Sequence, residues 1–242
     1  MNSTNPQFQQ LQDMMALMDK DEAFLPELEP YLQRLPNGVL MLNSPLVQEL
    51  CVQVGKGAYC NKRYQLKKDA VERALREENW HTYIFMHERP YRFEAFRTIA
   101  RHISPREYWK VVRNVWDDSE NIWQHRITWA NLFSKEDPLR PLLMSRRERK
   151  FLSGLPQKFV VYRGQVKKSH SGMSWTLDRD KAEWFASRYQ RSNPSLLVKG
   201  IADKQFVIAY MEDRNESEIV IPHGRVADQH TYRVKPKVET QG

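Results

Sequence analysis

The sequence predicts an α+β protein in which a mainly α-helical N-terminal region precedes a module of strands and helices. Apolar side chains recur at helical spacing between residues 66 and 130, whereas residues 159–222 contain short β-branched and aromatic runs. We therefore expect an N-terminal arm at 1–38, a helical region at 39–150 and an α+β core at 151–242.

Composition favours a folded domain with an anionic partner. Apolar residues make up 40% of the 242-residue chain, and 38 basic against 30 acidic residues give a net charge of +8. Residues 139–168 contain nine basic side chains and a single acidic one, Glu148. This run is either a solvated surface or a surface for a nucleotide, nucleic acid or acidic protein.

The two cysteines, Cys51 and Cys60, cannot form a disulfide scaffold and are expected to be small core residues in a reducing compartment. The N-terminus lacks the pattern of a signal peptide. The longest uncharged run, 35–48, is short and broken by Pro and Gly, so we expect a soluble cytoplasmic protein without a membrane span.

Three helices are expected before residue 135. The first, at 66–75, would bury Leu66, Ala70 and Ala74. The second begins at Ser104-Pro105-Arg106-Glu107, a capping-box pattern with Pro at the first helical position. Asp117-Asp118-Ser119 then separates it from a third helix.

The third helix would bury Ile122, Trp123 and Ile127, with Ala130 continuing this face. Trp109, Trp116 and Trp123 recur every seven residues, and an aromatic stripe at this spacing indicates core rather than a ligand site.

In the C-terminal module, strands are expected at 159–164, 205–210 and 219–222. A helix is expected at 178–189 with Asp178 as its cap. Its buried face would consist of Ala182, Phe185, Ala186 and Tyr189.

Three short segments carry candidate chemistry. Arg163 closes an apolar strand just before Gly164, so its guanidinium needs an anion or a carboxylate, and Gly164 permits close approach of a ligand. Ser174 and Thr176 share one face of an extended stretch, where their hydroxyls either orient a carboxylate or cap the following helix.

The third segment is Asn215-Glu216-Ser217-Glu218 followed by Ile-Val-Ile-Pro. In an extended strand Glu216 and Glu218 share one face, and two adjacent carboxylates require compensation, for which Arg163 is a candidate. A solvated loop end is the alternative interpretation.

Together, and in this order, these segments resemble the R-S-E class of mono-ADP-ribosyltransferases, which includes bacterial toxins and phage-borne enzymes. The resemblance covers residues 156–235 and departs from the usual Ser-Thr-Ser pattern at Ser174-Trp175-Thr176. It implies a split β-sandwich and an effector that acts in the cytoplasm, there on a host protein.

The resemblance also implies the roles of the site residues. NAD⁺, the substrate, would be held by Arg163, Gly164, Ser174 and Thr176, and no metal is required. Ser174 would orient the catalytic Glu218. Glu216 would act on an acceptor arginine, and residues 211–215 would recognise the acceptor protein.

Three alternatives remain open at this point. An NAD⁺ glycohydrolase would use the same residues with water as the acceptor. A nucleic-acid-binding module would use the basic run at 139–168 without catalysis. A transferase that modifies nucleic acid combines the two interpretations, but Glu216 does not suggest it. A catalytically inactive domain of the same fold is the third.

Overall fold

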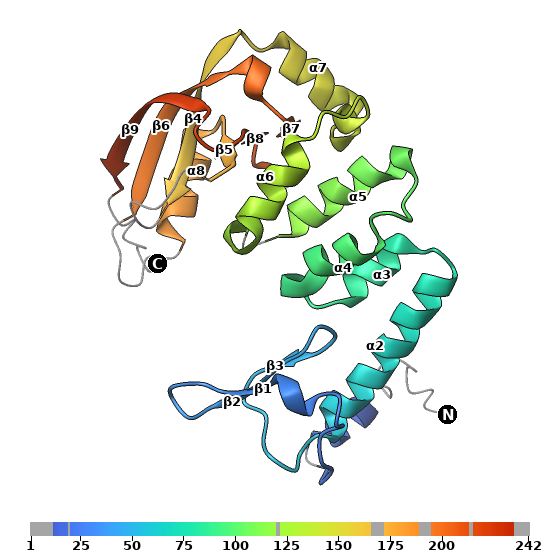
Figure 1. Cartoon of the computed structure of the whole chain (residues 1–242). Coiled ribbons are helices and arrows are strands. Elements are labelled where there is room, and N and C mark those ends of the chain that lie inside the picture. Colours follow the sequence, from blue (N-terminus) through green and yellow to red (C-terminus); the bar gives the residue numbers. More distant parts are fainter. Residues whose placement is uncertain are drawn as a thin grey trace, which may run out of the picture. The chain divides into compact units, whose positions relative to one another are not determined.

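The computed structural model describes residues 12–18, 20–119, 122–165, 172–188, 195–212 and 215–234 (Figure 1). The chain divides into two compact units, one of residues 1–103 and 118–120, the other of residues 104–117 and 121–242. Helix and sheet are mixed, as expected for an α+β protein. The division lies at 103/104 and not at the expected 150/151, because helices after residue 104 pack with the C-terminal sheet.

The first unit contains a helical segment at residues 12–16, a small antiparallel sheet of order β1-β2-β3 and the helices α2, α3 and α4. Its elements are η1 (Glu29–Tyr31), β1 (Leu32–Arg34), β2 (Leu40–Asn43), β3 (Gln48–Glu49), α2 (Ala58–Arg76), α3 (Trp80–Met86), η2 (Arg89–Tyr91) and α4 (Arg92–Ile99). The sheet was not expected in a mainly helical region, and it begins within the predicted arm at 1–38.

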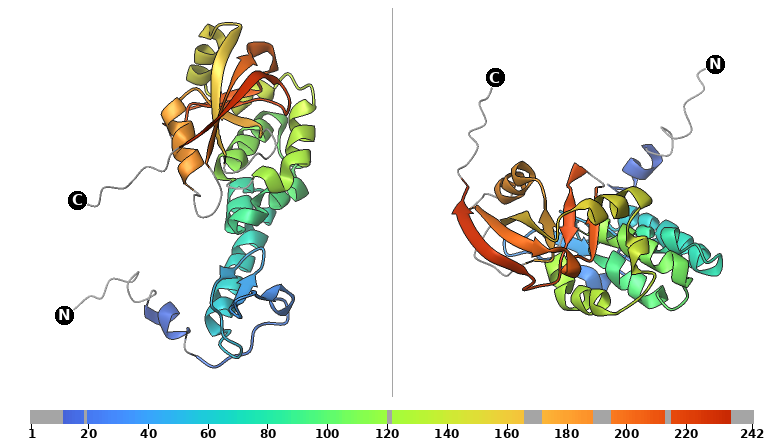
Figure 2. Two further views of the ribbon diagram at one scale, coloured as in Figure 1. Left: turned by 90° about the vertical axis from the view of Figure 1, so that its left-hand side faces the viewer. Right: turned by 90° about the horizontal axis from the view of Figure 1, so that it is seen from above.

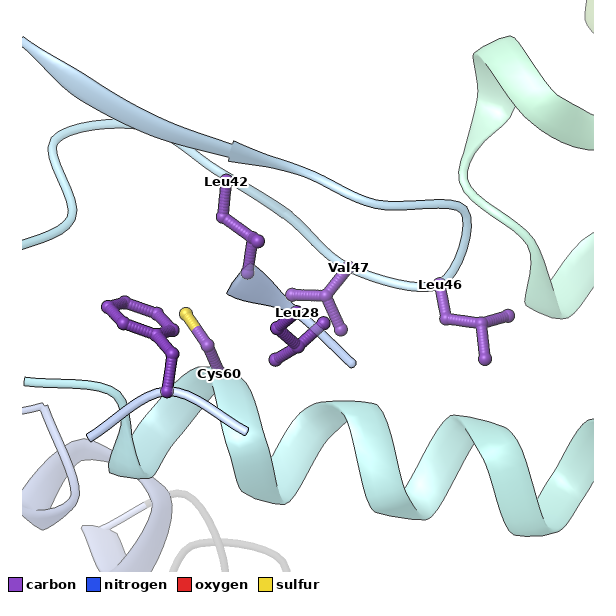
Figure 3. Packing of buried hydrophobic residues seen from close by; sticks show 6 residues of the cluster. Leu28, Leu42, Leu46, Val47 and Cys60 are labelled. Atoms are coloured by element: carbon purple, nitrogen blue, oxygen red, sulfur yellow. The ribbon is translucent and has the colours of Figure 1, made fainter. Parts of the chain in front are cut away.

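A hairpin turn explains the β1–β2 pair. Gly38 has φ +84°, a left-handed conformation that glycine adopts without a steric penalty, and its amide donates to the Leu35 carbonyl. Leu42 then points into a cluster with Leu28, Val47 and Cys60 (Figure 3). Burial raises the pKa of the Cys60 thiol to about 11, as befits a core residue. Cys51, in contrast, is exposed, so its expected core position was wrong.

Helix α2 begins at Ala58, eight residues before the expected start. Ala74 is buried as predicted and Ala70 is half-buried, but Leu66 and Leu75 are both 47% exposed, and Cys60 joins the buried residues instead. The apolar pattern at 66–75 therefore predicted the helix and one residue of its buried face, Ala74, but not the exposure of its leucines.

The second unit is built around a six-stranded antiparallel sheet of order β7-β8-β5-β4-β6-β9. Its strands are β4 (Lys158–Gln165), β5 (Ser174–Thr176), β6 (Leu196–Asp203), β7 (Ala209–Met211), β8 (Glu218–Val220) and β9 (Val226–Arg233). Its helices are α5 (Pro105–Asp118), η3 (Ile122–His125), α6 (Arg126–Ser134), η4 (Arg140–Leu143), α7 (Arg146–Gly154), α8 (Arg179–Ser187) and η5 (Lys204–Phe206). The long strands β4, β6 and β9 form one half of the sheet, and the short strands β5, β7 and β8 form the other. The two halves are joined where β4 pairs with β5, at Tyr162 opposite Thr176.

Helix α5 begins with Pro105, as predicted, and the Ser104 hydroxyl donates to the Glu107 carboxylate at 2.7 Å. Trp109 and Trp116 are both buried, which confirms them as core residues. The next segment differs from the prediction, since η3 precedes α6 and Ile127 is 65% exposed. The core residues of α6 are Trp129, Leu132 and Phe133. The Trp123 side chain lies outside the described part of the chain.

Helix α8 confirms the helix expected at 178–189. Asp178 caps it by accepting from the Lys181 amide at 3.1 Å, and Ala182 and Ala186 are fully buried. Tyr189, the last residue of the expected buried face, lies outside the described residues. The strand expected at 205–210 starts only at Ala209, because residues 204–206 form η5, capped by the Asp203 side chain.

Gly164 allows α8 to pack closely on β4 (Figures 1 and 2). A Cβ built on Gly164 would lie 2.0 Å from the Ala182 carbonyl oxygen and 2.5 Å from the Ala186 amide nitrogen. These are backbone atoms of α8, so they cannot move without displacing the helix. The strand–helix contact therefore requires glycine here.

We expect Gly164→Ala to destabilise the protein by about 3 kcal/mol, because the added methyl overpacks a backbone contact. Gly154→Ala is the control, since nothing lies within 4 Å of a Cβ built at Gly154. Chemical denaturation followed by circular dichroism measures both. Equal stabilities of the two variants would contradict the close packing.

Candidate active site around Glu218

The carboxylate of Glu218 is the centre of the candidate site. Glu218 begins β8 opposite Thr176 of β5, and its side chain is only 6% exposed. The Ser174 hydroxyl donates a hydrogen bond to this carboxylate. The indole Nε1–H of Trp116 donates to both carboxylate oxygens, at 3.2 and 3.3 Å. The structure thus brings Ser174 and Glu218 together and adds a tryptophan from α5.

Burial sets the protonation chemistry of Glu218. Loss of water raises the pKa of this carboxyl, and the nearby charges of Asp117 and Glu216 act in the same direction. The hydrogen bonds from Ser174 and Trp116 oppose the rise, because they stabilise the ionised form. A carboxylate with a raised pKa in a buried position is typical of functional sites.

Arg163 supplies positive charge to the same region. Its burial lowers the pKa of the guanidinium to about 10, and the charge of Glu218 opposes that shift. The guanidinium donates through Nη1 to the Ser174 carbonyl, and it lies so close over Gly172 that a Cβ there would meet its Cζ at 2.1 Å. Its Nε is buried and has no hydrogen-bond partner among the described residues. One donor is therefore left for an acceptor from outside the protein.

Thr176 has a different role from that of Ser174. Its hydroxyl donates to the Glu216 carbonyl at 2.7 Å and accepts from the Asp178 amide at 3.0 Å. The adjacent Leu177 amide donates to the Ser217 carbonyl at 3.1 Å. Both contacts fix the backbone before Glu218, so Thr176 holds the turn and does not contact the carboxylate in this arrangement.

The turn before β8 has an unusual backbone. Asn215 has φ +56° and Ser217 has φ +46°, left-handed conformations on either side of Glu216. Ser217 has a Cβ and therefore pays a steric penalty here, of roughly 1 kcal/mol or more. Glu216 thus lies outside the extended strand, and its expected sharing of one strand face with Glu218 was wrong. The half-buried Glu216 is presented by a constrained turn instead.

Tyr210 of β7 helps to hold this turn. Its hydroxyl shares a side-chain hydrogen bond with Ser217, and its ring stacks on Phe151 of α7 with centroids 4.3 Å apart. Because a strained residue needs surrounding support, these contacts account for the persistence of the left-handed conformation at Ser217.

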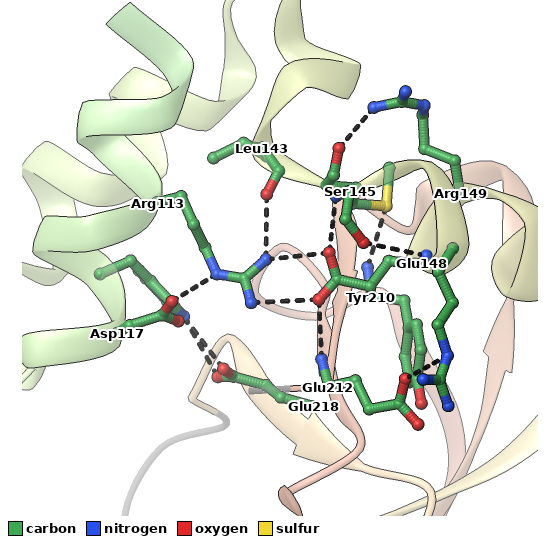
Figure 4. Close-up of polar contacts among 12 residues, drawn as sticks. Arg113, Asp117, Leu143, Ser145, Glu148, Arg149, Tyr210, Glu212 and Glu218 are labelled. Carbon is green, nitrogen blue, oxygen red and sulfur yellow. Dashed lines mark hydrogen bonds and ion pairs between the residues drawn. The ribbon is translucent and has the colours of Figure 1, made fainter. Parts of the chain in front are cut away.

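A buried charge network lies beside the site (Figure 4). Arg113 of α5 donates to Asp117, to the Leu143 carbonyl at 3.0 Å and to Glu148 of α7 at 3.1 Å. Glu148 also accepts from the amides of Ser145 at 2.6 Å and Glu212 at 2.9 Å. Burial alone would raise the pKa of Glu148, but these hydrogen bonds outweigh it and hold the pKa below its usual value.

This network connects α5 and α7 to the sheet. Ser145 and Glu148 form a full capping box at the start of α7. The Glu212 amide belongs to the segment at 211–215, in which Asp213 and Arg214 lie outside the described residues. Arg113 and Glu148 therefore anchor the beginning of the segment that ends at Glu216.

Sequence reasoning identified Arg163, Ser174 and Glu218 but missed the partners from α5 and α7. Trp116 was interpreted as core alone, although a buried indole needs an acceptor for its N–H. Glu148 was noted only as the one acid in a basic run. The pattern Ser145-x-x-Glu148 was the available signal for its capping role.

The basic run at 139–168 is divided by the fold. Arg163 is a partly buried site residue, whereas Arg146, Arg147 and Lys150 are exposed on α7. Lys167 and Lys168 lie outside the described residues. Within the described residues, no helix is both long and apolar enough to cross a membrane, and no group of three His, Cys, Asp or Glu side chains is arranged to hold a metal ion.

Comparisons of the chain with protein-family models, with curated proteins and with solved structures find no match.

We expect Trp116→Phe to raise the pKa of Glu218, because the variant loses the N–H that stabilises the ionised carboxylate. Trp109→Phe is a matched control on the same helix, since Trp109 is equally buried and donates to Asp137 at 2.8 Å instead. Carbon-13 NMR titration of the glutamate carboxyls measures the shift. The same pKa in both variants would contradict a direct hydrogen bond.

Glu218→Gln should stabilise the protein at neutral pH. A carboxyl whose pKa is raised by folding contributes stability below its unfolded pKa and loses it as the pH rises through the folded pKa. The gain in melting temperature should therefore increase with pH, by a few degrees for roughly 1 kcal/mol. Thermal unfolding of both proteins from acidic to neutral pH measures this difference. A gain in melting temperature that is largest at acidic pH would exclude the proposed linkage.

Proposed function

We propose that the chain is a mono-ADP-ribosyltransferase that transfers ADP-ribose from NAD⁺ to an arginine of an acceptor protein. The observation that carries this proposal is the hydrogen bond from Ser174 to the buried Glu218, with the Arg163 guanidinium in electrostatic range. The three residues come from segments whose order and spacing resemble the R-S-E class.

Arg163 and Ser174 have the chemistry that NAD⁺ binding needs. A guanidinium suits the oxygens of a phosphate, and one buried N–H of Arg163 has no partner in the part of the chain that the structure describes. In the proposed enzyme, Arg163 contacts a phosphate or ribose of NAD⁺, while Ser174 keeps the Glu218 carboxylate oriented.

Glu218 has the chemistry to stabilise the transition state. Cleavage of the bond between ribose C1′ and the nicotinamide nitrogen sends the electron pair to nicotinamide and leaves positive charge on the ribose, as in glycoside hydrolysis. A fixed carboxylate stabilises charge that is absent from the ground state, and this raises turnover. The hydrogen bonds from Ser174 and Trp116 favour the ionised form of Glu218 and oppose the effect of its burial.

Glu216 is assigned to the acceptor side. An arginine nitrogen forms the new bond to C1′ and releases a proton, which Glu216 accepts and passes to solvent. The half-buried turn that carries Glu216 has its backbone held by Thr176, so the carboxylate is supported from β5. Hydrolysis of NAD⁺ is the background reaction when water replaces the arginine.

The proposal is tested with NAD⁺ labelled in its adenylate moiety, incubated with purified protein and a bacterial lysate. Glu218→Gln should lower both nicotinamide release and protein labelling by at least about 100-fold, since it removes the charge opposite the oxocarbenium. Glu216→Gln should lose labelling but retain hydrolysis.

Glu183→Gln serves as the control, because Glu183 pairs with Arg179 on the surface of α8. Its activity should match that of the unmodified protein. Equal activity in all four proteins would refute the assignment of Glu218. Nicotinamide release without any labelled macromolecule would instead identify a glycohydrolase.

A further inference from the structure

Helix α7 exposes a basic face beside the acceptor-side turn. Arg146, Arg147 and Lys150 are exposed, and the Arg147 side chain retains 83% of its accessible surface. Phe151 is 44% exposed although its ring stacks on Tyr210. Four such side chains within six residues form a surface that is cationic with one apolar contact point.

Three contacts join α7 to the turn that carries Glu216. The Glu212 amide donates to Glu148, the Glu212 carboxylate pairs with Arg147 at 3.3 Å, and Tyr210 bridges Phe151 and Ser217. The helix is therefore connected to this part of the chain by one buried acceptor, one ring contact and one surface ion pair.

The outward row of α7 follows from its geometry. Glu148 points inward to Arg113, and Arg147 and Phe151 lie one turn apart facing β7 and the turn. Arg146 and Lys150 form the adjacent row of the helix, also one turn apart. Carboxylates at the turn and cations on α7 thus lie side by side.

We propose that this face of α7 docks the acceptor protein and selects an arginine that has aspartate or glutamate neighbours. The inference rests on the proposed function, since it assigns the substrate of the same site. The acceptor arginine faces Glu216 and Glu212, while its acidic neighbours face Arg146 and Lys150. Phe151 provides the apolar contact that such interfaces use as an anchor.

The charge arrangement favours a protein over a nucleic acid. A nucleic acid presents a continuous row of phosphates, which the carboxylates of Glu212 and Glu216 would repel. An arginine among acidic residues presents both signs of charge in the order that the turn and α7 require.

The test compares the double variant Arg146→Glu/Lys150→Glu with Arg106→Glu/Lys110→Glu. Both pairs are exposed, one turn apart, begin in the first turn of a helix of the same unit, and change the net charge equally. Each protein is incubated with labelled NAD⁺ and four probes: an arginine peptide flanked by glutamates, one flanked by serines, agmatine, and a DNA duplex.

The unmodified protein should modify the glutamate-flanked peptide with a kcat/KM about tenfold above that of the serine-flanked peptide at low salt, as expected for two favourable surface ion pairs. This preference should disappear in the α7 variant, persist in the α5 variant, and weaken as salt screens the charges. Agmatine labelling and nicotinamide release should be the same in all three proteins.

No preference between the peptides in the unmodified protein, or equal loss in both variants, would overturn the docking proposal while leaving the transferase intact. Labelling of the duplex in preference to the peptides would overturn it in favour of nucleic acid. Absence of both nicotinamide release and agmatine labelling in the unmodified protein would contradict the proposed function itself, and docking with it.

Discussion

The arrangement of the second unit depends on the hydrogen bonds that stabilise the buried carboxylate of Glu218. Glu218 has lost almost all contact with water, so burial raises its pKa, and the fold supplies donors that favour the ionised form. Ser174 comes from the neighbouring strand, and Trp116 comes from a helix 102 residues earlier in the chain. Both donors are needed, because a buried carboxylate that loses one hydrogen-bond donor destabilises the folded state by the cost of its desolvation. The packing of α5 against the sheet therefore affects the pKa of Glu218, because α5 carries Trp116.

The backbone before Glu218 shows the same dependence on several elements. Two left-handed residues, Asn215 and Ser217, bracket Glu216, and strain of this kind persists only where neighbours impose it. Thr176 from β5 and Tyr210 from β7 supply hydrogen bonds on opposite sides of the turn. A free loop would relax into an extended strand, with Glu216 carried to the face of Glu218. The turn instead takes Glu216 out of the strand, although its charge still contributes to the raised pKa of Glu218.

The sequence predicted those features that depend on residues close together in the chain. The start of α5 at Pro105 and the cap of α8 at Asp178 follow from side chains within four residues, and both were predicted from the sequence. The pairing of Ser174 with Glu218 was expected only through a resemblance, since nothing in either segment specifies the other. The β1–β2 hairpin was missed although Gly38 marked its turn, because the run around it was considered only as a membrane span. Ile127 was assigned to the core because helical periodicity gives no information on where the preceding turn is 3₁₀ instead of α.

The charges of α7 show why composition alone is ambiguous. Glu148 and its basic neighbours form one continuous run in sequence, yet the helix sends the acid inward and leaves Arg146 and Lys150 outside. The inward acid accepts from Arg113 of α5, and it also accepts from the Glu212 amide, which follows β7. Replacing Arg113 and Glu148 with apolar residues would leave the Glu212 amide without an acceptor. The pair therefore contributes more than its own ion-pair energy to the fold. Its role is positional, because it links α5 and α7 to the Glu212 amide, in the segment that precedes Glu216.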